Sequence, residues 1–380
     1  MKIAQVCPYD WNYPGGLRDH IFNLSNQLIQ MGHDVHILTP GLDTHDTQSG
    51  VPVHRTGRTI PFPFNGSIAR ISIVPSLAWN VRRILQREHF DVIHIHEPLV
   101  PGLSLNALRL SRTTTIGTFH AFAQSDITSL PHLVYSSASP LLRRYFRRLD
   151  GRIAVSSAAH QFISRYFPAD YRIIPNGIDG QRFHSQIAPL PQFMDGKRNI
   201  LFVGRFEERK GARYLLQAIP AIRERHRNTR LIFVGEGQLR AGLQRVVEQA
   251  AWLDIVFAGR VSEDEKPRYF ASSHVFCAPS TGGESMGVVL LEAMASGTPL
   301  VASNIPGYAT VVTSGVDGLL TAPRNSEELA HAIASLLENE PLRQQLIQAG
   351  LQKVHTYVWP FIAQRIMDYY YTLLNERQRG

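Results

Sequence analysis

The chain has 380 residues, 44% of them hydrophobic, and a net charge of +8 from 39 Lys and Arg against 31 Asp and Glu. The length suits two domains of about 150–200 residues, and the apolar content excludes a mainly disordered chain. The longest apolar runs reach about eight residues, which excludes a membrane span of about 20. Cys7 and Cys277 lie in apolar runs and predict buried free thiols in a reducing cytoplasm.

The positive charge lies mainly in the first half of the chain. Residues 1–176 contain 17 Lys and Arg against 11 Asp and Glu, a balance of +6, and residues 177–380 contain 22 against 20, a balance of +2. This asymmetry indicates an anionic partner for the first half, and composition alone leaves it open between nucleic acid, lipid headgroups and phosphate.

The first half alternates strands and helices. KIAQVC predicts a strand, apolar residues then recur at helical spacing from Leu17 to Met31, and HDVHILTP predicts the next strand. A basic amphipathic helix follows over 76–89, with further strands over 90–98, 113–121 and 151–157. Such alternation predicts a parallel sheet with right-handed crossovers.

The same alternation starts again at residue 199. NILFVG predicts a strand, residues 211–226 a helix and RLIFVGEG the next strand. We therefore expect an α/β protein of two Rossmann-like, doubly wound parallel-sheet domains that face a central cleft. Their expected ranges are 1–175 together with the C-terminal helix 359–380, a Pro- and Gly-rich linker over 176–197, and 198–358.

Loops that follow the strands of doubly wound sheets bind ligands. The loop after the first strand places Gly15 and Gly16 at a helix start, where backbone N–H groups favour an anion, although a plain turn explains them too. This loop lacks the GxGxxG pattern of dinucleotide-binding proteins.

The corresponding loop of the second half is GRFEERKG. Arg205 and Lys210 lie on its strand-to-helix connection and suit phosphate oxygens, with solvated surface charge as the alternative. Further along, Glu284 precedes a helix that carries Glu292, and two such carboxylates can hold separate hydroxyl groups of one extended ligand. The amides of Ser285, Met286 and Gly287 are available at that helix start.

These segments together resemble a known enzyme family. Glu284 and Glu292 form an E-x7-E element within GGESMGVVLLEAMASGTPLVAS, and the GRFEERKG loop, PNGID at 175–179 and the Pro-Gly-Gly loop accompany it. Over nearly its whole length the chain resembles the retaining glycosyltransferases of family four, which have the GT-B fold. Within that family, the chain is most similar to phosphatidylinositol mannosyltransferase-like enzymes. Five segments carry this similarity: VCPYDWNYPGGLRDHIFNLSNQL, IPFPFNGSIAR, DVIHIHEP, FHAF and GRIAVS.

The resemblance implies roles for the donor-site residues. Gly16, beside Gly15, is expected near the donor β-phosphate, and Arg205 and Lys210 are expected to bind the pyrophosphate. It also implies that Glu284, with the loop amides, holds the transferred sugar and that Glu292 binds the ribose hydroxyls. His120 is expected beside the sugar and the attacking hydroxyl, so the implied catalytic set is His120, Arg205, Lys210 and Glu284.

The chemistry implied by the family needs no metal and no other cofactor. Fixed cations and amides stabilise the negative charge that grows on the departing diphosphate. No D-x-D motif is present in the sequence, and retention is expected through front-face attack. His94 and His96 offer a competing metal-site reading, but they belong to the HIHEP segment of the family, so we expect no metal site.

The basic first half has two expected uses. Arg82, Arg83 and Arg87 lie on the 76–89 helix and predict contact with an anionic membrane at its cytoplasmic face, although a solvated face of a core helix is the alternative. No nucleic-acid-binding module is recognisable in the sequence.

The resemblance also implies an acceptor site for an inositol headgroup. Its residues are Tyr9, Arg18, Asn65, Ser67, Arg70 and His120. Two departures from the family point to the possibility of another polyol or lipid headgroup: Arg18 stands where Gln is usual, and Ala121-Phe122-Ala123 stands where hydroxyl residues are usual.

We expect a retaining hexosyltransferase that moves mannose from GDP-mannose to a lipid headgroup such as phosphatidylinositol. Two alternatives stay open. One is a transferase that uses a UDP sugar and another lipid or soluble acceptor. The other is a non-catalytic sugar-nucleotide-binding or membrane adaptor. Such an adaptor would not need all six of Gly16, His120, Arg205, Lys210, Glu284 and Glu292.

Overall fold

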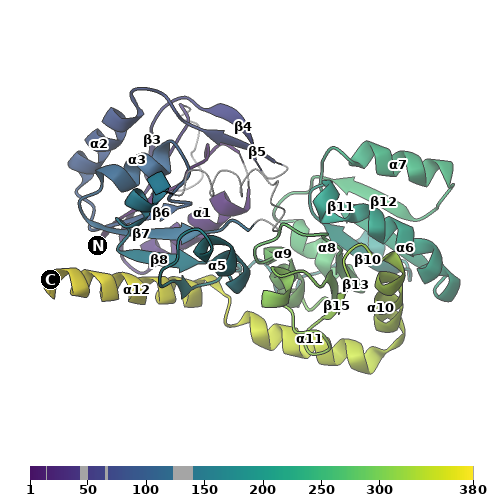
Figure 1. The fold of residues 1–380 in the computed structure, drawn as a ribbon. Coiled ribbons are helices and arrows are strands. Elements are labelled where there is room, and N and C mark those ends of the chain that lie inside the picture. The colour runs from purple at the N-terminus through teal and green to yellow at the C-terminus, as the bar shows by residue number, and fades with distance from the viewer. Residues whose placement is uncertain (14, 43–49, 65–66, 123–139, 380) are drawn as a thin grey trace. The chain divides into compact units, whose positions relative to one another are not determined.

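The computed structural model describes residues 1–13, 15–42, 50–64, 67–122 and 140–379 (Figure 1). The expected acceptor residue Asn65 and the last residue of the Ala121-Phe122-Ala123 segment lie outside these ranges, as does the side chain of Ser67. The chain divides into two units: Met1–Gly177 together with Trp359–Gly380, and Ile178–Val358.

The first unit is built on a seven-stranded parallel sheet with the order β3-β2-β1-β6-β7-β8-β9. The strands are β1 (Lys2–Val6), β2 (Asp34–Thr39), β3 (Val53–Arg55), β6 (Val92–His96), β7 (Thr114–Phe119), β8 (Gly151–Ala154) and β9 (Arg172–Ile173). The helices are α1 (Gly16–Gln30), α2 (Leu77–Glu88), α3 (Leu103–Leu110), α5 (Ser157–Ser164) and α12 (Trp359–Arg379). A separate antiparallel hairpin joins β4 (Ile60–Phe64) to β5 (Ser67–Ile71).

Helices cover both faces of this sheet, which explains why the central strands β6 and β7 are buried along their whole length. On one face, Ile3, Val92 and Ile116 pack against Ile366 and Tyr370 of α12. The C-terminal helix therefore returns to the first unit, beside β7 and β8 in Figure 1. The other face packs against α2 and α3.

The second unit repeats the architecture with a six-stranded parallel sheet in the order β12-β11-β10-β13-β14-β15. The strands are β10 (Arg198–Val203), β11 (Thr229–Val234), β12 (Ile255–Gly259), β13 (Val275–Ala278), β14 (Leu300–Ser303) and β15 (Leu319–Thr321). The helices are α6 (Ala212–Arg225), α7 (Arg240–Gln249), α8 (Lys266–Ala271), α9 (Val288–Ala295), α10 (Ser326–Glu338) and α11 (Glu340–Val354). The expected doubly wound α/β class is thus confirmed.

The segment expected as a linker belongs to the second unit from Ile178 onward. Ile178, Phe183, Leu190 and Phe193 are buried in the core formed with α9 and its neighbours. The Pro and Gly residues between them hid this apolar pattern, because the segment has no α-helix or strand to give it a period and only a short 3-10 helix over Pro191–Phe193.

Two further features agree with the sequence. Cys7 and Cys277 are both buried and free, and burial raises the pKa of the Cys7 thiol to about 12. Among the helices in the described ranges, none is both long enough and apolar enough to cross a bilayer.

Candidate active site

The carboxyl ends of β6 and β7 bring a glutamate under the expected catalytic histidine. Glu97, which follows β6 with a φ of 50°, accepts hydrogen bonds from the backbone N–H groups of His120 at 2.6 Å and Ala121 at 2.7 Å. Burial raises the pKa of Glu97 to about 7, although both N–H groups act in the opposite direction. Glu97 therefore fixes the backbone that carries His120, a role that the sequence analysis missed.

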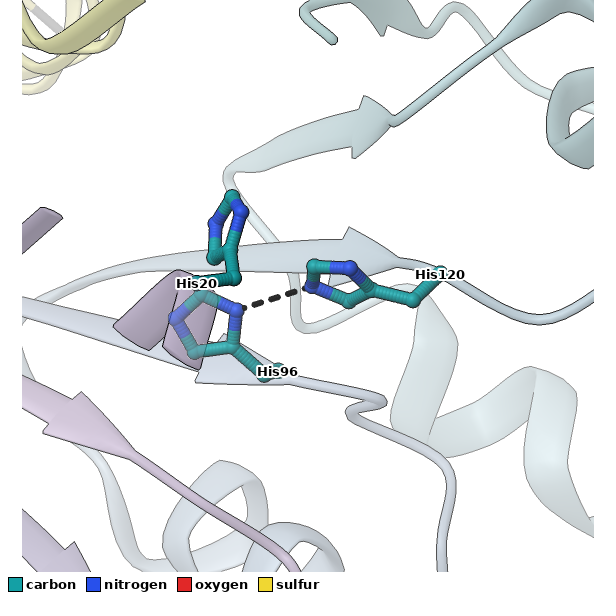
Figure 2. Close-up of side chains that lie close together, drawn as sticks. All are labelled: His20, His96 and His120. Carbon is teal, nitrogen blue, oxygen red and sulfur yellow. Dashed lines mark hydrogen bonds between the residues drawn. The ribbon is translucent and has the colours of Figure 1, made fainter. Parts of the chain in front are cut away.

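Three histidines gather at this edge of the first sheet (Figure 2). His96 Nδ1 lies 3.0 Å from His120 Nε2, and the His20 ring stands edge-on to both, with centroids at 5.2 Å from His96 and 4.7 Å from His120. Burial lowers the pKa of His20 to about 4 and those of His96 and His120 well below their ordinary range. All three imidazoles are therefore neutral at pH 7.

Neutral imidazoles are also the form that binds metals, and one nitrogen of each of the His20, His96 and His120 rings lies within 4.8 Å of the others.

His94, the other histidine of the HIHEP segment, is not part of this group. It is fully buried, with Nδ1 at 2.6 Å from the Tyr370 hydroxyl and Nε2 at 2.6 Å from the Thr118 hydroxyl. Both nitrogens of His94 thus make hydrogen bonds inside the protein.

The expected phosphate loop lies at the start of α1. A Cβ atom added to Gly15 or Gly16 would meet no other atom of the described structure within 4 Å. Packing therefore does not require glycine at either position, and the space beside the helix start is open to a ligand.

The acceptor residues within the described ranges lie on and beside the loop after β1. Arg18 stacks over Trp11 at 5.4 Å from its ring centroid, and Arg70 over Tyr13 at 3.7 Å. The backbone N–H of Asp10 donates to the carbonyl of Arg70 at 3.0 Å, which joins this loop to β5. Tyr9 is partly buried beside them.

In the second unit, Glu284 is bound by two cations. Its Oε1 lies 2.7 Å from Lys210 Nζ and 2.5 Å from an Arg209 nitrogen, although these residues are about 75 positions apart in the chain. Burial acts to raise the pKa of Glu284, but the charges of Lys210 and Arg209 outweigh burial and hold the pKa below its ordinary value. Glu284 and Lys210, both predicted, thus lie together, and Arg209 is a partner that the prediction missed.

Arg205 makes a different ion pair. It lies 2.8 Å from Glu207, which also pairs with Arg209, and about half of its side chain is exposed. An exposed guanidinium at the end of a central strand can still turn toward a phosphate.

Glu292 is buried on α9 and pairs with Lys266 of α8 at 2.6 Å. Its second oxygen, Oε2, is buried and makes no hydrogen bond within the described residues. A carboxylate oxygen in this state is ready to accept a hydroxyl donor, as the predicted ribose contact requires. Lys266 is a second partner that the sequence analysis did not find.

Backbone geometry shapes the loop between Glu284 and Glu292. Gly287 has a φ of 87°, and a Cβ there would lie 2.5 Å from the Tyr308 ring. A Cβ on Gly307 would lie 1.9 Å from the carbonyl oxygen of Glu284. The Met286 side chain packs in the core, so of this residue only the backbone suits a ligand contact.

The predicted membrane residues lie on the exposed side of α2. Arg82, Arg83 and Arg87 are all exposed, and Arg83 stacks over Trp79, which is itself 62% exposed. Arg87 differs from the other two because it pairs with Glu88 at 2.6 Å.

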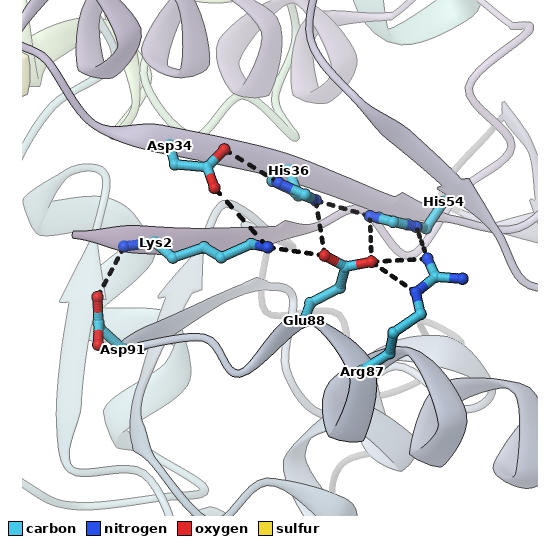
Figure 3. Close-up of polar contacts among 7 residues, drawn as sticks. All are labelled: Lys2, Asp34, His36, His54, Arg87, Glu88 and Asp91. Atoms are coloured by element: carbon cyan, nitrogen blue, oxygen red, sulfur yellow. Dashed lines mark hydrogen bonds and ion pairs between the residues drawn. The ribbon is translucent and has the colours of Figure 1, made fainter.

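Glu88 anchors α2 to the edge of the sheet where the strands begin (Figure 3). It binds Lys2 of β1 at 2.7 Å, and its oxygens lie 3.9 Å from His36 Nδ1 and 4.0 Å from His54 Nε2. His36 Nδ1 and His54 Nε2 are 2.7 Å apart. His36, His54 and Glu88 could together hold a metal ion. However, Lys2 and Arg87 already bind the Glu88 carboxylate, and these ion pairs hold α2 in place without a metal.

Comparisons with known proteins agree with this arrangement. Residues 14–182 match the family described as Glycosyltransferase Family 4, and residues 188–353 match Glycosyl transferases group 1. The chain is 37% identical over 379 residues to the phosphatidyl-myo-inositol mannosyltransferase of Mycobacterium leprae, covering 98% of this chain and 97% of that protein. The chain belongs to glycosyltransferase family 4.

Other relatives of this glycosyltransferase extend the likeness. The phosphatidyl-myo-inositol mannosyltransferase of Mycobacterium tuberculosis is 35% identical, with 98% of this chain and 97% of that protein covered. Among solved structures, HepE of Anabaena in complex with UDP and glucose has a TM-score of 0.78 at 20% identity, over 98% of this chain and 100% of that chain. A glycosyltransferase of Rickettsia africae also has a TM-score of 0.78, at 17% identity and 98% coverage of both chains. These structures have the GT-B fold, which confirms that fold for this enzyme.

Proposed function

We propose that this glycosyltransferase moves mannose from GDP-mannose to the inositol headgroup of phosphatidylinositol at the cytoplasmic face of the membrane. The observation that carries the proposal is the 37% identity, over nearly the whole of both chains, to an enzyme named phosphatidyl-myo-inositol mannosyltransferase. The second unit binds the donor in this account, and the first unit binds the acceptor.

Donor binding uses the charges around Glu284. Lys210 and Arg209 neutralise this carboxylate, and a bound diphosphate would draw on the same cations. Glu284 would then accept hydrogen bonds from hydroxyl groups of the mannose, and Glu292 Oε2 would accept them from hydroxyl groups of the ribose. Arg205, which is half exposed, would bind the diphosphate with Lys210. In the first unit, Gly15 and Gly16 leave space for a phosphate at the start of α1.

The transfer step breaks the bond between the anomeric carbon of mannose and the diphosphate oxygen, and its electron pair leaves with GDP. The acceptor oxygen attacks from the same face and forms the new bond, which retains the configuration. Its proton passes to the departing diphosphate. Lys210 and Arg205 stabilise the charge that grows on this leaving group, so the step needs no metal ion. His120 orients the attacking hydroxyl and the sugar.

Membrane contact is proposed for α2. Arg82 and Arg83 supply exposed positive charge, and exposed Trp79 supplies an amphipathic ring of the kind that is favoured at headgroup depth. Arg87 contributes less, because Glu88 already neutralises it.

One observation favours a second acceptor class. Arg18, which replaces the usual Gln of the family, stacks on Trp11 beside Tyr9 and presents a cation at the proposed acceptor site. A cation there suits a headgroup with an additional anionic group better than plain inositol.

A thermal-shift comparison tests the donor assignment. GDP-mannose should raise the melting temperature, whereas UDP-glucose and UDP-N-acetylglucosamine at equal concentration should raise it less, because at a given concentration the ligand with the lower Kd stabilises the folded state more. A larger shift with a UDP sugar would replace the proposed donor. No shift with any nucleotide sugar would contradict the proposal and leave only the membrane adaptor of the non-catalytic alternatives.

A further inference from the structure

A chain of buried hydrogen bonds leads from the C-terminal helix to His120. The hydroxyl of Tyr370 on α12 lies 3.3 Å from Gln5 Nε2, and Gln5 Oε1 lies 2.9 Å from His96 Nε2. His96 Nδ1 in turn lies 3.0 Å from His120 Nε2. Gln5, His96 and Tyr370 have no exposed surface, so bulk water does not reach these bonds.

A second branch starts from the same hydroxyl. Tyr370 lies 2.6 Å from His94 Nδ1, and His94 Nε2 lies 2.6 Å from the hydroxyl of Thr118. Burial lowers the pKa of His94 to about 3, so this ring, like that of His96, carries a single proton at pH 7. Each ring must therefore donate at one nitrogen and accept at the other.

Counting donors along the chain fixes where each proton lies. With Gln5 oriented as in the structure, its amide donates to Tyr370 and its carbonyl accepts from His96 Nε2–H. Nδ1 of His96 is then bare and accepts from His120 Nε2–H. The result is a His120 ring whose Nδ1 carries a lone pair and makes no hydrogen bond with the described residues.

The second branch has the same direction. Because the Tyr370 oxygen accepts from Gln5, its own proton goes to His94 Nδ1, and His94 donates from Nε2 to Thr118. If the amide of Gln5 turned over, every bond would reverse, and His120 would carry its proton on Nδ1. The hydrogen bonds of the network can thus run in either of two donor-to-acceptor directions, and the Tyr370 hydroxyl joins both branches.

We propose that Gln5 and Tyr370 are positioning residues that hold His120 in the tautomer with a protonated Nε2 and a bare Nδ1. His120 then presents a hydrogen-bond acceptor to a hydroxyl of the acceptor or of the transferred sugar. This use of His120 rests on the proposed function, whereas the tautomer itself does not. A ring held in the wrong tautomer would offer a donor where the reaction needs an acceptor.

Nitrogen-15 NMR of histidine-labelled enzyme tests the proposal directly, since the shifts of the two ring nitrogens report which one carries the proton. His120→Asn identifies the His120 signals. Tyr370→Phe should move them toward a mixture of tautomers and lower kcat by about 10-fold or more with the donor KM unchanged. Tyr369→Phe is the matched control, because it removes a hydroxyl of the same helix that accepts from the Arg152 backbone N–H at 3.1 Å and lies outside this network.

Thr118→Val is a second variant that keeps the side-chain shape. It leaves His94 Nε2–H without an acceptor, so it should favour the reversed donor-to-acceptor direction and increase the Nδ1-protonated form of His120. Unchanged His120 shifts in both Tyr370→Phe and Thr118→Val, each with a normal melting curve, would overturn the proposal. Changed shifts with full transfer activity would keep the positioning role but reject the proposed use of His120 in the reaction.

Discussion

The carboxylate of Glu284 lies 2.7 Å from the ammonium of Lys210, and both side chains are largely buried. The pair joins the loop after β10 to the loop before α9 and places a charged acceptor among cations. In the proposed reaction, ligand hydroxyls and phosphates would bind these same groups.

Replacing Glu284 by Gln should therefore impair catalysis more than folding. The amide keeps the volume of the side chain but loses its charge, and we expect transfer to fall by about 100-fold or more. Glu338→Gln is the control, because Glu338 forms a partly exposed ion pair with Arg225 in the same unit, and its activity should be unchanged. Equal rates for both variants, measured with a saturating donor, would remove Glu284 from the reaction.

The raised pKa of Glu97 predicts a pH-dependent stability. Its folded-state pKa of about 7 lies above the ordinary value of 4.5, so between these values the folded chain binds more protons than the unfolded one. Wild-type stability should thus fall relative to Glu97→Gln as pH rises from 4.5 to 7, by about 3 kcal/mol. Denaturant unfolding of both proteins measures the difference in their free energies of unfolding, from which the contribution of the buried histidines cancels. A difference that stays constant from pH 4.5 to 7 would contradict the raised pKa of Glu97.

Gly307 predicts a backbone effect on the donor site. A Cβ there would lie 1.9 Å from the Glu284 carbonyl oxygen, so Gly307→Ala must displace the loop and should abolish most donor binding. Gly242 on α7 has open space around it, and Gly242→Ala should instead stabilise the fold by up to about 1 kcal/mol. Melting curves with and without nucleotide distinguish these outcomes. Normal nucleotide binding by Gly307→Ala would show that the Glu284 loop tolerates displacement.

The exposed face of α2 predicts a charge-dependent membrane contact. The double variant Arg82→Ser and Arg83→Ser should bind vesicles that contain phosphatidylinositol about 30-fold more weakly, since each basic residue near an anionic surface contributes about 1 kcal/mol. Arg227→Ser with Arg245→Ser removes two exposed charges from the second unit and serves as the control. Sedimentation with vesicles measures both, and equal losses would assign the effect to net charge rather than to α2.

Elements with a strong period were predictable from the sequence. Apolar runs with alternating helices predicted both parallel sheets. The E-x7-E element drew attention to Glu284 and Glu292, which pair with Lys210 and Lys266 in the structure. Short features without a period, such as β3, β9 and the β4–β5 hairpin, were not predicted.

Partnerships between distant residues were not predictable. Arg209 reaches Glu284, Glu97 reaches the backbone of His120, and Tyr370 reaches His94 across 276 positions. No local pattern marks such contacts, because they depend on how crossovers bring strand ends and α12 together. The arginines of α2 show the same limit of prediction from sequence. Arg82 and Arg87 were given the same expected membrane role, but only the structure shows that Glu88 neutralises Arg87.

The most direct test of the central claim is transfer of radiolabelled mannose from GDP-mannose to phosphatidylinositol vesicles by the purified enzyme. We predict a labelled lipid in which mannose keeps its anomeric configuration, in the presence of a metal chelator, and little product from Glu284→Gln. Labelled lipid formed only from a UDP sugar, or equal product from the wild type and Glu284→Gln, would contradict the account.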